Sequence, residues 1–66
     1  MEKFKVGDKV RIVGIVGGTD NPLGSVGIIS YINEEDEDCR VIVKGYTDDN
    51  LVNWSPWVEI ELVEGE

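Results

Sequence analysis

Near its start the chain reads Gly7-Asp8-Lys9-Val10-Arg11-Ile12, in which a Gly-Asp turn leads into alternating apolar and basic residues. This alternation is typical of a strand that buries one face. The middle of the chain carries a second such stretch, Gly24-Ser25-Val26-Gly27-Ile28-Ile29, and the end carries a third, Val58-Glu59-Ile60-Glu61-Leu62-Val63. The three stretches account for much of the 66-residue chain and predict an all-β fold.

Five strands are predicted, at about residues 8–15, 26–32, 39–44, 51–54 and 58–62. Four glycines and a proline in residues 14–24 favour a long irregular connection between the first two strands. Ser55-Pro56-Trp57 predicts a single 3-10 turn, because serine can cap a helix and proline fits its first turn. The acidic block Glu34-Glu35-Asp36-Glu37-Asp38 is expected to form a solvated turn.

Strand alternation also predicts which side chains point inward. The expected core consists of Val10, Ile12, Val26, Ile28, Val41, Val43, Val58, Ile60 and Leu62. Cys39 is expected to join them as a small buried residue. If the first and last strands pair, the outward basic residues of one strand meet the outward acidic residues of the other. These residues are Lys9 and Arg11 on the first strand and Glu59 and Glu61 on the last.

Composition limits the chain to one domain, residues 1–66, with 41% hydrophobic residues available for a core. Fourteen acidic and six basic residues give a net charge of -8, so we expect no direct binding to nucleic acid. The sequence contains one cysteine and no long apolar segment, which favours a cytoplasmic protein without membrane insertion. A monomer is expected.

The first two stretches and the ending Glu59-Ile60-Glu61-Leu62-Val63 resemble those of small SH3-like barrels. Similar proteins include KOW-type domains, the peripheral E subunit of photosystem I, and small phage-encoded or bacterial accessory proteins. The resemblance implies a five-stranded SH3-like barrel with a 3-10 turn before the last strand. KOW-type domains imply RNA or ribosomal partners reached through basic loops, and the photosystem subunit implies docking aided by positive charge. The loops of this chain are glycine-rich or acidic, which argues against RNA binding, and its net charge of -8 argues against docking on an electron carrier.

Residues suited to catalysis are few. The chain has no histidine, which removes the commonest general base and metal ligand. Neither acidic segment has the spacing of a calcium-binding loop, and the glycine-rich segment lacks the Gly-Lys-Ser/Thr ending of a phosphate loop. We therefore expect a non-enzymatic protein without a cofactor or a metal.

The aromatic residues near the C-terminus suggest a binding role. In a 3-10 turn, residues three apart share a side, so Trp54 and Trp57 are expected to form an aromatic shelf with Tyr46 beside residues 14–24. Three carboxylates are expected to rim this shelf, those of Asp20, Asp48 and Asp49. The alternative is that at least one tryptophan covers the core.

Two functions follow from these observations. The first is a protein-interaction module whose shelf and acidic rim bind a basic or proline-containing segment of a partner protein. The second is an acidic inhibitor whose carboxylates imitate nucleic-acid phosphates and block a basic groove on a host or defence protein. The resemblance to small phage-encoded proteins implies a phage origin for such an inhibitor. The first should depend on one or two tryptophans, and the second should weaken steeply with salt.

Overall fold

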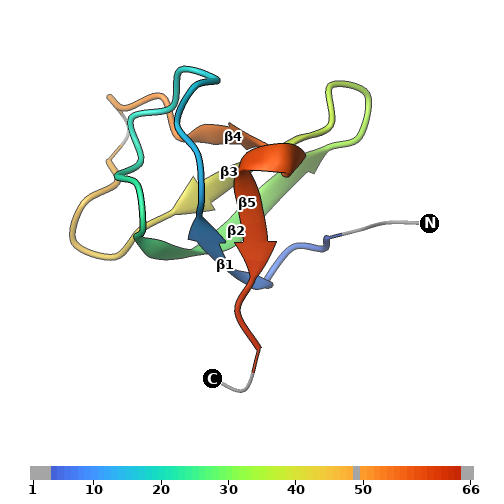
Figure 1. Cartoon of the computed structure of the whole chain (residues 1–66), viewed down its shortest axis with the longest axis horizontal. Helices are drawn as coiled ribbons and strands as arrows, with labels where there is room; N and C mark the ends of the chain where they lie inside the picture. Colours follow the sequence, from blue (N-terminus) through green and yellow to red (C-terminus); the bar gives the residue numbers. More distant parts are fainter. Residues whose placement is uncertain (1–3, 49, 65–66) are drawn as a thin grey trace.

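The computed structural model describes residues 4–48 and 50–64, which form one antiparallel sheet and one 3-10 turn (Figure 1). The elements are β1 (Lys9–Ile12), β2 (Val26–Asn33), β3 (Asp38–Ile42), β4 (Trp54–Pro56), η1 (Trp57–Glu59) and β5 (Ile60–Leu62). The strand order is β4-β3-β2-β1-β5. The predicted all-β fold of five strands, with a 3-10 turn before the last strand, is confirmed. The sheet is not closed, because β4 and β5 are its two edges.

Several predicted boundaries were wrong. β1 ends at Ile12, so the first connection is longer than expected. β4 begins at Trp54 and continues through Pro56, where residues 51–54 were expected to form the strand. The 3-10 turn starts at Trp57, two residues later than predicted. This last shift changes the direction of the tryptophans, as described below.

The predicted pairing of the first and last strands is confirmed. β1 and β5 run antiparallel, with Val10 opposite Leu62 and Ile12 opposite Ile60. Arg11 lies opposite Glu61, so one of the expected pairs of opposite charge faces across the two strands. Glu59 lies in η1, before β5, and its carboxylate accepts hydrogen bonds from the backbone of Val16 and Gly17.

The core is a cluster of eight buried residues with two more packed against it. The buried residues are Phe4, Val10, Ile12, Ile29, Cys39, Val41, Val43 and Ile60, and Ile32 and Trp57 pack on them. The prediction was correct for Val10, Ile12, Val41, Val43, Ile60 and Cys39. The prediction was wrong for Ile28, Val58 and Leu62, which are 42%, 84% and 44% exposed. The prediction was also wrong for Val26, which is half-buried but lies on the outer face opposite Arg11.

A β-bulge explains the error in β2. The register of β2 against β3 shifts between Ile29 and Tyr31, which leaves Ser30 as an extra residue. The strand therefore turns Ile29 and Ile32 inward, three residues apart, and leaves Ile28 on the outer face. Val58 is exposed for another reason, since it lies in η1 and does not follow strand alternation.

In the described part of the chain, no helix is both long enough and apolar enough to cross a membrane.

Candidate functional site

The predicted aromatic shelf does not form, because Trp54 and Trp57 lie on opposite sides of the sheet. Ser55 is fully buried, so its neighbour Trp54 points to the outer face, where its ring centre lies 5.7 Å from that of Tyr31. Trp57 packs against the core, with its ring 6.3 Å from that of Phe4 at an angle of 63°. The alternative expectation, that one tryptophan covers the core, is confirmed for Trp57.

Two of the other predicted site residues join loops to each other. The Tyr46 hydroxyl donates a hydrogen bond of 2.7 Å to the backbone carbonyl of Asp20. The carboxylate of Asp20 accepts a hydrogen bond of 2.8 Å from the backbone N–H of Val52, and the Asp20 N–H donates back to the Val52 carbonyl. These contacts hold the connection between β1 and β2 against the connection between β3 and β4. The carboxylate of Asp48 accepts a local hydrogen bond of 2.8 Å from the backbone N–H of Asn50.

Asp49 lies outside the described residues, so its predicted place in the rim has no structural counterpart.

Asn21 anchors the same pair of loops from inside. Its side chain is 2% exposed, and its Nδ2 donates to the carbonyls of Val41 and Asn53 at 3.4 and 3.3 Å. The Thr47 hydroxyl donates a hydrogen bond of 3.4 Å to Oδ1 of Asn21. The sequence placed Asn21 only in an irregular loop, and its sole signal was the turn-forming Asn-Pro pair.

The first half of the loop is held by Glu59. The Glu59 carboxylate accepts hydrogen bonds from the backbone N–H groups of Val16 at 3.0 Å and Gly17 at 3.1 Å. The Glu59 backbone carbonyl also accepts a bond from the N–H of Val13. Strand alternation predicted an outward Glu59 opposite the basic residues of the first strand, and this contact was missed.

Glycine is required where this loop crosses η1 and the end of β4. A Cβ atom on Gly17 would lie 2.7 Å from Cγ of Pro56, and one on Gly14 would lie 3.0 Å from Cγ of Glu59. Both distances are shorter than ordinary van der Waals contact. The glycines predicted as breakers of regular structure therefore also allow close packing.

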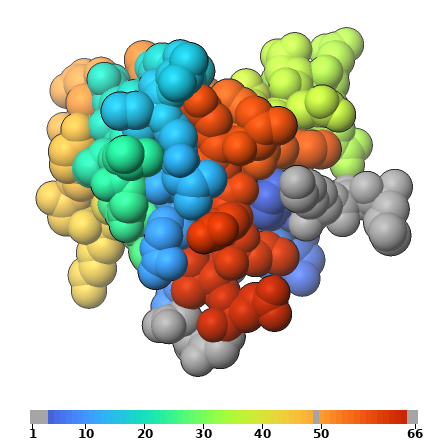
Figure 2. All heavy atoms as spheres, viewed as in Figure 1, coloured from blue at the N-terminus to red at the C-terminus, as the bar shows by residue number. Residues whose placement is uncertain are grey.

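Exposed apolar side chains lie close to the hydrogen bonds between Glu59 and the loop. Val16 is 94% exposed and Val58 is 84% exposed, and both lie beside Glu59. Val13 and Ile15 on the same loop are about half exposed. Figure 2 shows the blue and cyan loop against the orange-red segment of η1. We call Val13, Ile15, Val16 and Val58 the loop surface.

The loop surface has acidic neighbours. The backbone carbonyl of Glu37 in the β2–β3 turn accepts a hydrogen bond of 2.9 Å from the N–H of Trp57, so this turn lies next to η1. Glu37 is exposed, as are the residues before it in the turn. Glu61, on β5, is exposed and has Arg11 opposite it. The turn therefore places negative charge beside η1, the element that carries Val58.

Cys39 is a core residue and a poor nucleophile. It is fully buried, and burial raises the pKa of its thiol to about 11. The nearby Trp57 indole lowers that pKa in part, and the charge of Asp38 raises it further. Burial, followed by the charge of Asp36, also raises the pKa of Asp38.

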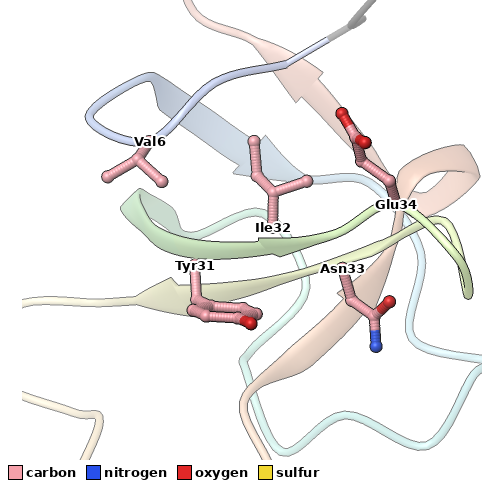
Figure 3. Close-up of a pocket in the computed structure, with 5 residues that line it drawn as sticks. All are labelled: Val6, Tyr31, Ile32, Asn33 and Glu34. Atoms are coloured by element: carbon pink, nitrogen blue, oxygen red, sulfur yellow. The ribbon is translucent and has the colours of Figure 1, made fainter.

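Sites for small ligands are shallow. A depression beside β2 is lined by Val6, Tyr31, Ile32, Asn33 and Glu34 (Figure 3). Tyr31 and Asn33 project from one face of β2 and Ile32 from the other, so the depression wraps the strand without enclosing a cavity (Figure 3). In residues 4–48 and 50–64, no three Cys, Asp or Glu side chains gather in a way that could hold a metal ion.

Comparison with known proteins gave no match to any family model, curated protein or solved structure. Function must therefore be inferred from the surfaces of the chain itself.

Proposed function

We propose that this chain is a small non-enzymatic protein-interaction module that binds a basic or proline-containing segment of a partner protein on the loop surface. The observation that carries the proposal is the exposure of two valines beside Glu59: Val16, 94% exposed on the loop that Glu59 holds in place, and Val58, 84% exposed in η1. Exposed apolar side chains on an anchored loop lose little conformational freedom when a partner binds.

The chemistry of the partner follows from the neighbours of the loop surface. Apolar contact requires aliphatic or proline side chains, and an extended proline-containing segment presents them at low entropic cost. The exposed Glu37 and the net charge of -8 favour lysine or arginine beside those side chains. The same charge disfavours nucleic acid as a ligand.

The proposal includes the fold family and the compartment. The strand order, with β5 beside β1, and the 3-10 turn before β5 support an SH3-like assignment. The lone buried Cys39 is compatible with a reducing cytoplasm.

The exposed acidic turn favours a second candidate, an acidic inhibitor that occupies a basic groove of its target in place of nucleic acid. The four residues 34–37 are all exposed, and each carries a carboxylate. In this case the carboxylates of the turn would dominate binding and the aliphatic loop surface would contribute little.

Matched valine variants test the first proposal. Binding to an array of basic and proline-containing peptides is measured for the wild type, Val16→Ser, Val58→Ser and the control Val52→Ser. Val52 is 55% exposed but lies outside the loop surface, so its variant has the same chemistry at another place. We expect each loop-surface variant to weaken binding by roughly 1–2 kcal/mol and the control to bind like the wild type.

Salt dependence separates the two candidates. Peptide binding through apolar contacts should weaken only mildly as salt rises, whereas binding through dispersed carboxylates should weaken steeply. Equal losses in all three valine variants would contradict the first proposal. Full binding by both loop-surface variants, combined with loss after neutralising residues 34–37, would favour the acidic inhibitor.

A further inference from the structure

The outer face of the β2–β3–β4 part of the sheet carries large side chains that are partly exposed, with Ile28 at 42% and Tyr31 at 58%. Residues directly opposite each other on neighbouring strands share a face. Ile28 of β2 lies opposite Ile42 of β3, so two isoleucines stand side by side on the face away from the core. The core face of the same strands carries Ile29, Cys39 and Val41.

An aromatic row continues this outer face. Tyr31 lies opposite Arg40, and Arg40 lies opposite Trp54, so the three residues form one row across β2, β3 and β4. We call this the outer row. β2 and β4 flank β3 and are therefore about 10 Å apart. The Tyr31 and Trp54 ring centres are nevertheless only 5.7 Å apart, so the two rings lean toward each other across the middle strand.

Contacts within the chain hold the side chains of the outer row in place before any partner binds. Nε of Arg40 donates a hydrogen bond of 3.0 Å to Oδ1 of Asn53, which is itself 2% exposed. The two rings meet edge to face at 76°, the arrangement that aromatic pairs prefer. Tyr31 is still 58% exposed. A rigid aromatic pair that keeps much of its surface in water is typical of an interface centre.

The charge around the outer row differs from that of the molecule. Three of the five basic residues in the described part of the chain lie on the outer face of the sheet: Lys9 opposite Ile28, Arg11 opposite Val26, and Arg40 in the outer row. The exposed acidic residues 34–37 belong to the β2–β3 turn. Two acidic residues share this face, Glu61 opposite Arg11 and Asp38 two residues before Arg40 on β3. The charges on the strands of the outer face therefore nearly balance, whereas the whole chain has a net charge of -8.

We propose that the outer face of β2–β4 binds the same face of a second copy of this chain, contrary to the monomer expected from the sequence. Contact through this face brings two acidic molecules together where their own charge is least negative. A two-fold interface of ordinary size covers roughly 800 Å² per copy, which is about a fifth of the 4391 Å² surface of the chain. The outer row would lie at its centre. This dimer does not rest on the proposed function.

Sedimentation equilibrium over a wide concentration range tests the dimer. The wild type should fit a monomer–dimer equilibrium that tightens as salt rises, because salt screens the repulsion between two chains of net charge -8. Binding of a basic peptide to the loop surface should respond to salt in the opposite direction. The sign of the salt effect therefore distinguishes failure of the dimer from failure of the proposed function.

Substitutions in the outer row supply the second arm. Trp54→Ala should weaken self-association roughly 30-fold, as expected for an aromatic residue at an interface centre. Tyr31→Ser should weaken self-association as well. Because Tyr31 is exposed, the Tyr31→Ser variant should stay folded even if Trp54→Ala does not. Val58→Ser is the control, because Val58 is exposed outside the outer face and its variant should dimerise like the wild type. Circular dichroism confirms the fold of each variant.

Three outcomes would overturn the dimer. One is a wild-type chain that stays monomeric at every concentration and in high salt. Another is an equal loss of self-association in Tyr31→Ser and Val58→Ser. The third is a monomer that binds a single-stranded oligonucleotide through the outer row, since alternating aromatic and basic residues also suit stacked bases and phosphates.

Discussion

Replacing Ile29 and its neighbour Ile28 with alanine compares the two faces of β2 directly. Ile29 is 1% exposed and belongs to the core, whereas Ile28 is 42% exposed on the outer face. Ile29→Ala removes three buried carbon atoms, worth about 2.4 kcal/mol of transfer free energy, and the cavity term brings the expected loss to about 3–5 kcal/mol. Ile28→Ala should cost about 1 kcal/mol, because much of its side chain is already in water.

The first loss is large compared with the stability of so small a chain. For 66 residues the total free energy of unfolding should be about 3–10 kcal/mol. Ile29→Ala should therefore be unfolded or close to it, while Ile28→Ala should remain folded. Urea denaturation followed by tryptophan emission measures both values, at a protein concentration low enough to keep the chain monomeric. Equal losses, or a larger loss for Ile28→Ala, would refute the bulge and the inward direction of Ile29.

Three further predictions concern other parts of the molecule. Gly17→Ala should lower the thermal midpoint and cost about 1–3 kcal/mol, because its Cβ would lie 2.7 Å from Cγ of Pro56; an unchanged midpoint would mean that the loop moves away freely. Glu61→Lys should cost about 0.5 kcal/mol in urea denaturation by placing a like charge opposite Arg11, and adding Arg11→Glu should restore most of the loss. Cys39 should resist thiol reagents in the native state at pH 8, since the pKa of its thiol is raised to about 11. Because the unfolded chain releases that proton first, the free energy of unfolding should fall as the pH rises from the ordinary thiol pKa toward about 11, and a flat pH profile for this group would contradict the burial of Cys39.

Most of the strands could be predicted because they are short alternating runs between turn residues, but the three-residue β4 was placed too early in the chain. The pairing of Arg11 with Glu61 followed from the same alternation and is confirmed. Alternation failed in β2, where positions 28, 29 and 32 are all isoleucine. Either face could have been inward, and the extra Ser30 of the bulge has no sequence signature that fixes its place.

The candidate site was harder to predict because it depends on contacts between distant segments. A one-turn helix can begin at Ser55 or at Trp57 with the same residues, yet only the second start sends Trp54 to the outer face. The contact of Glu59 with the N–H groups of Val16 and Gly17 crosses more than forty residues of chain and leaves no local pattern. Asn21 likewise gains its role only from the carbonyls that the folded loops bring to it.

The pairing of β1 with β5 also determines the order in which the chain can fold. Ile12 pairs with Ile60, so most of the described chain lies inside the loop that this pair closes, and the entropy of closing a loop grows with its length. The β2–β3 hairpin has only a four-residue turn and can form first. Folding should therefore take milliseconds to seconds, as in other small proteins rich in long-range strand pairs. We expect the last strand to dock late for this reason, so a conservative truncation at Ile60 should mainly accelerate unfolding, and a folding rate that slows as much would show that the β1–β5 pair already forms in the transition state.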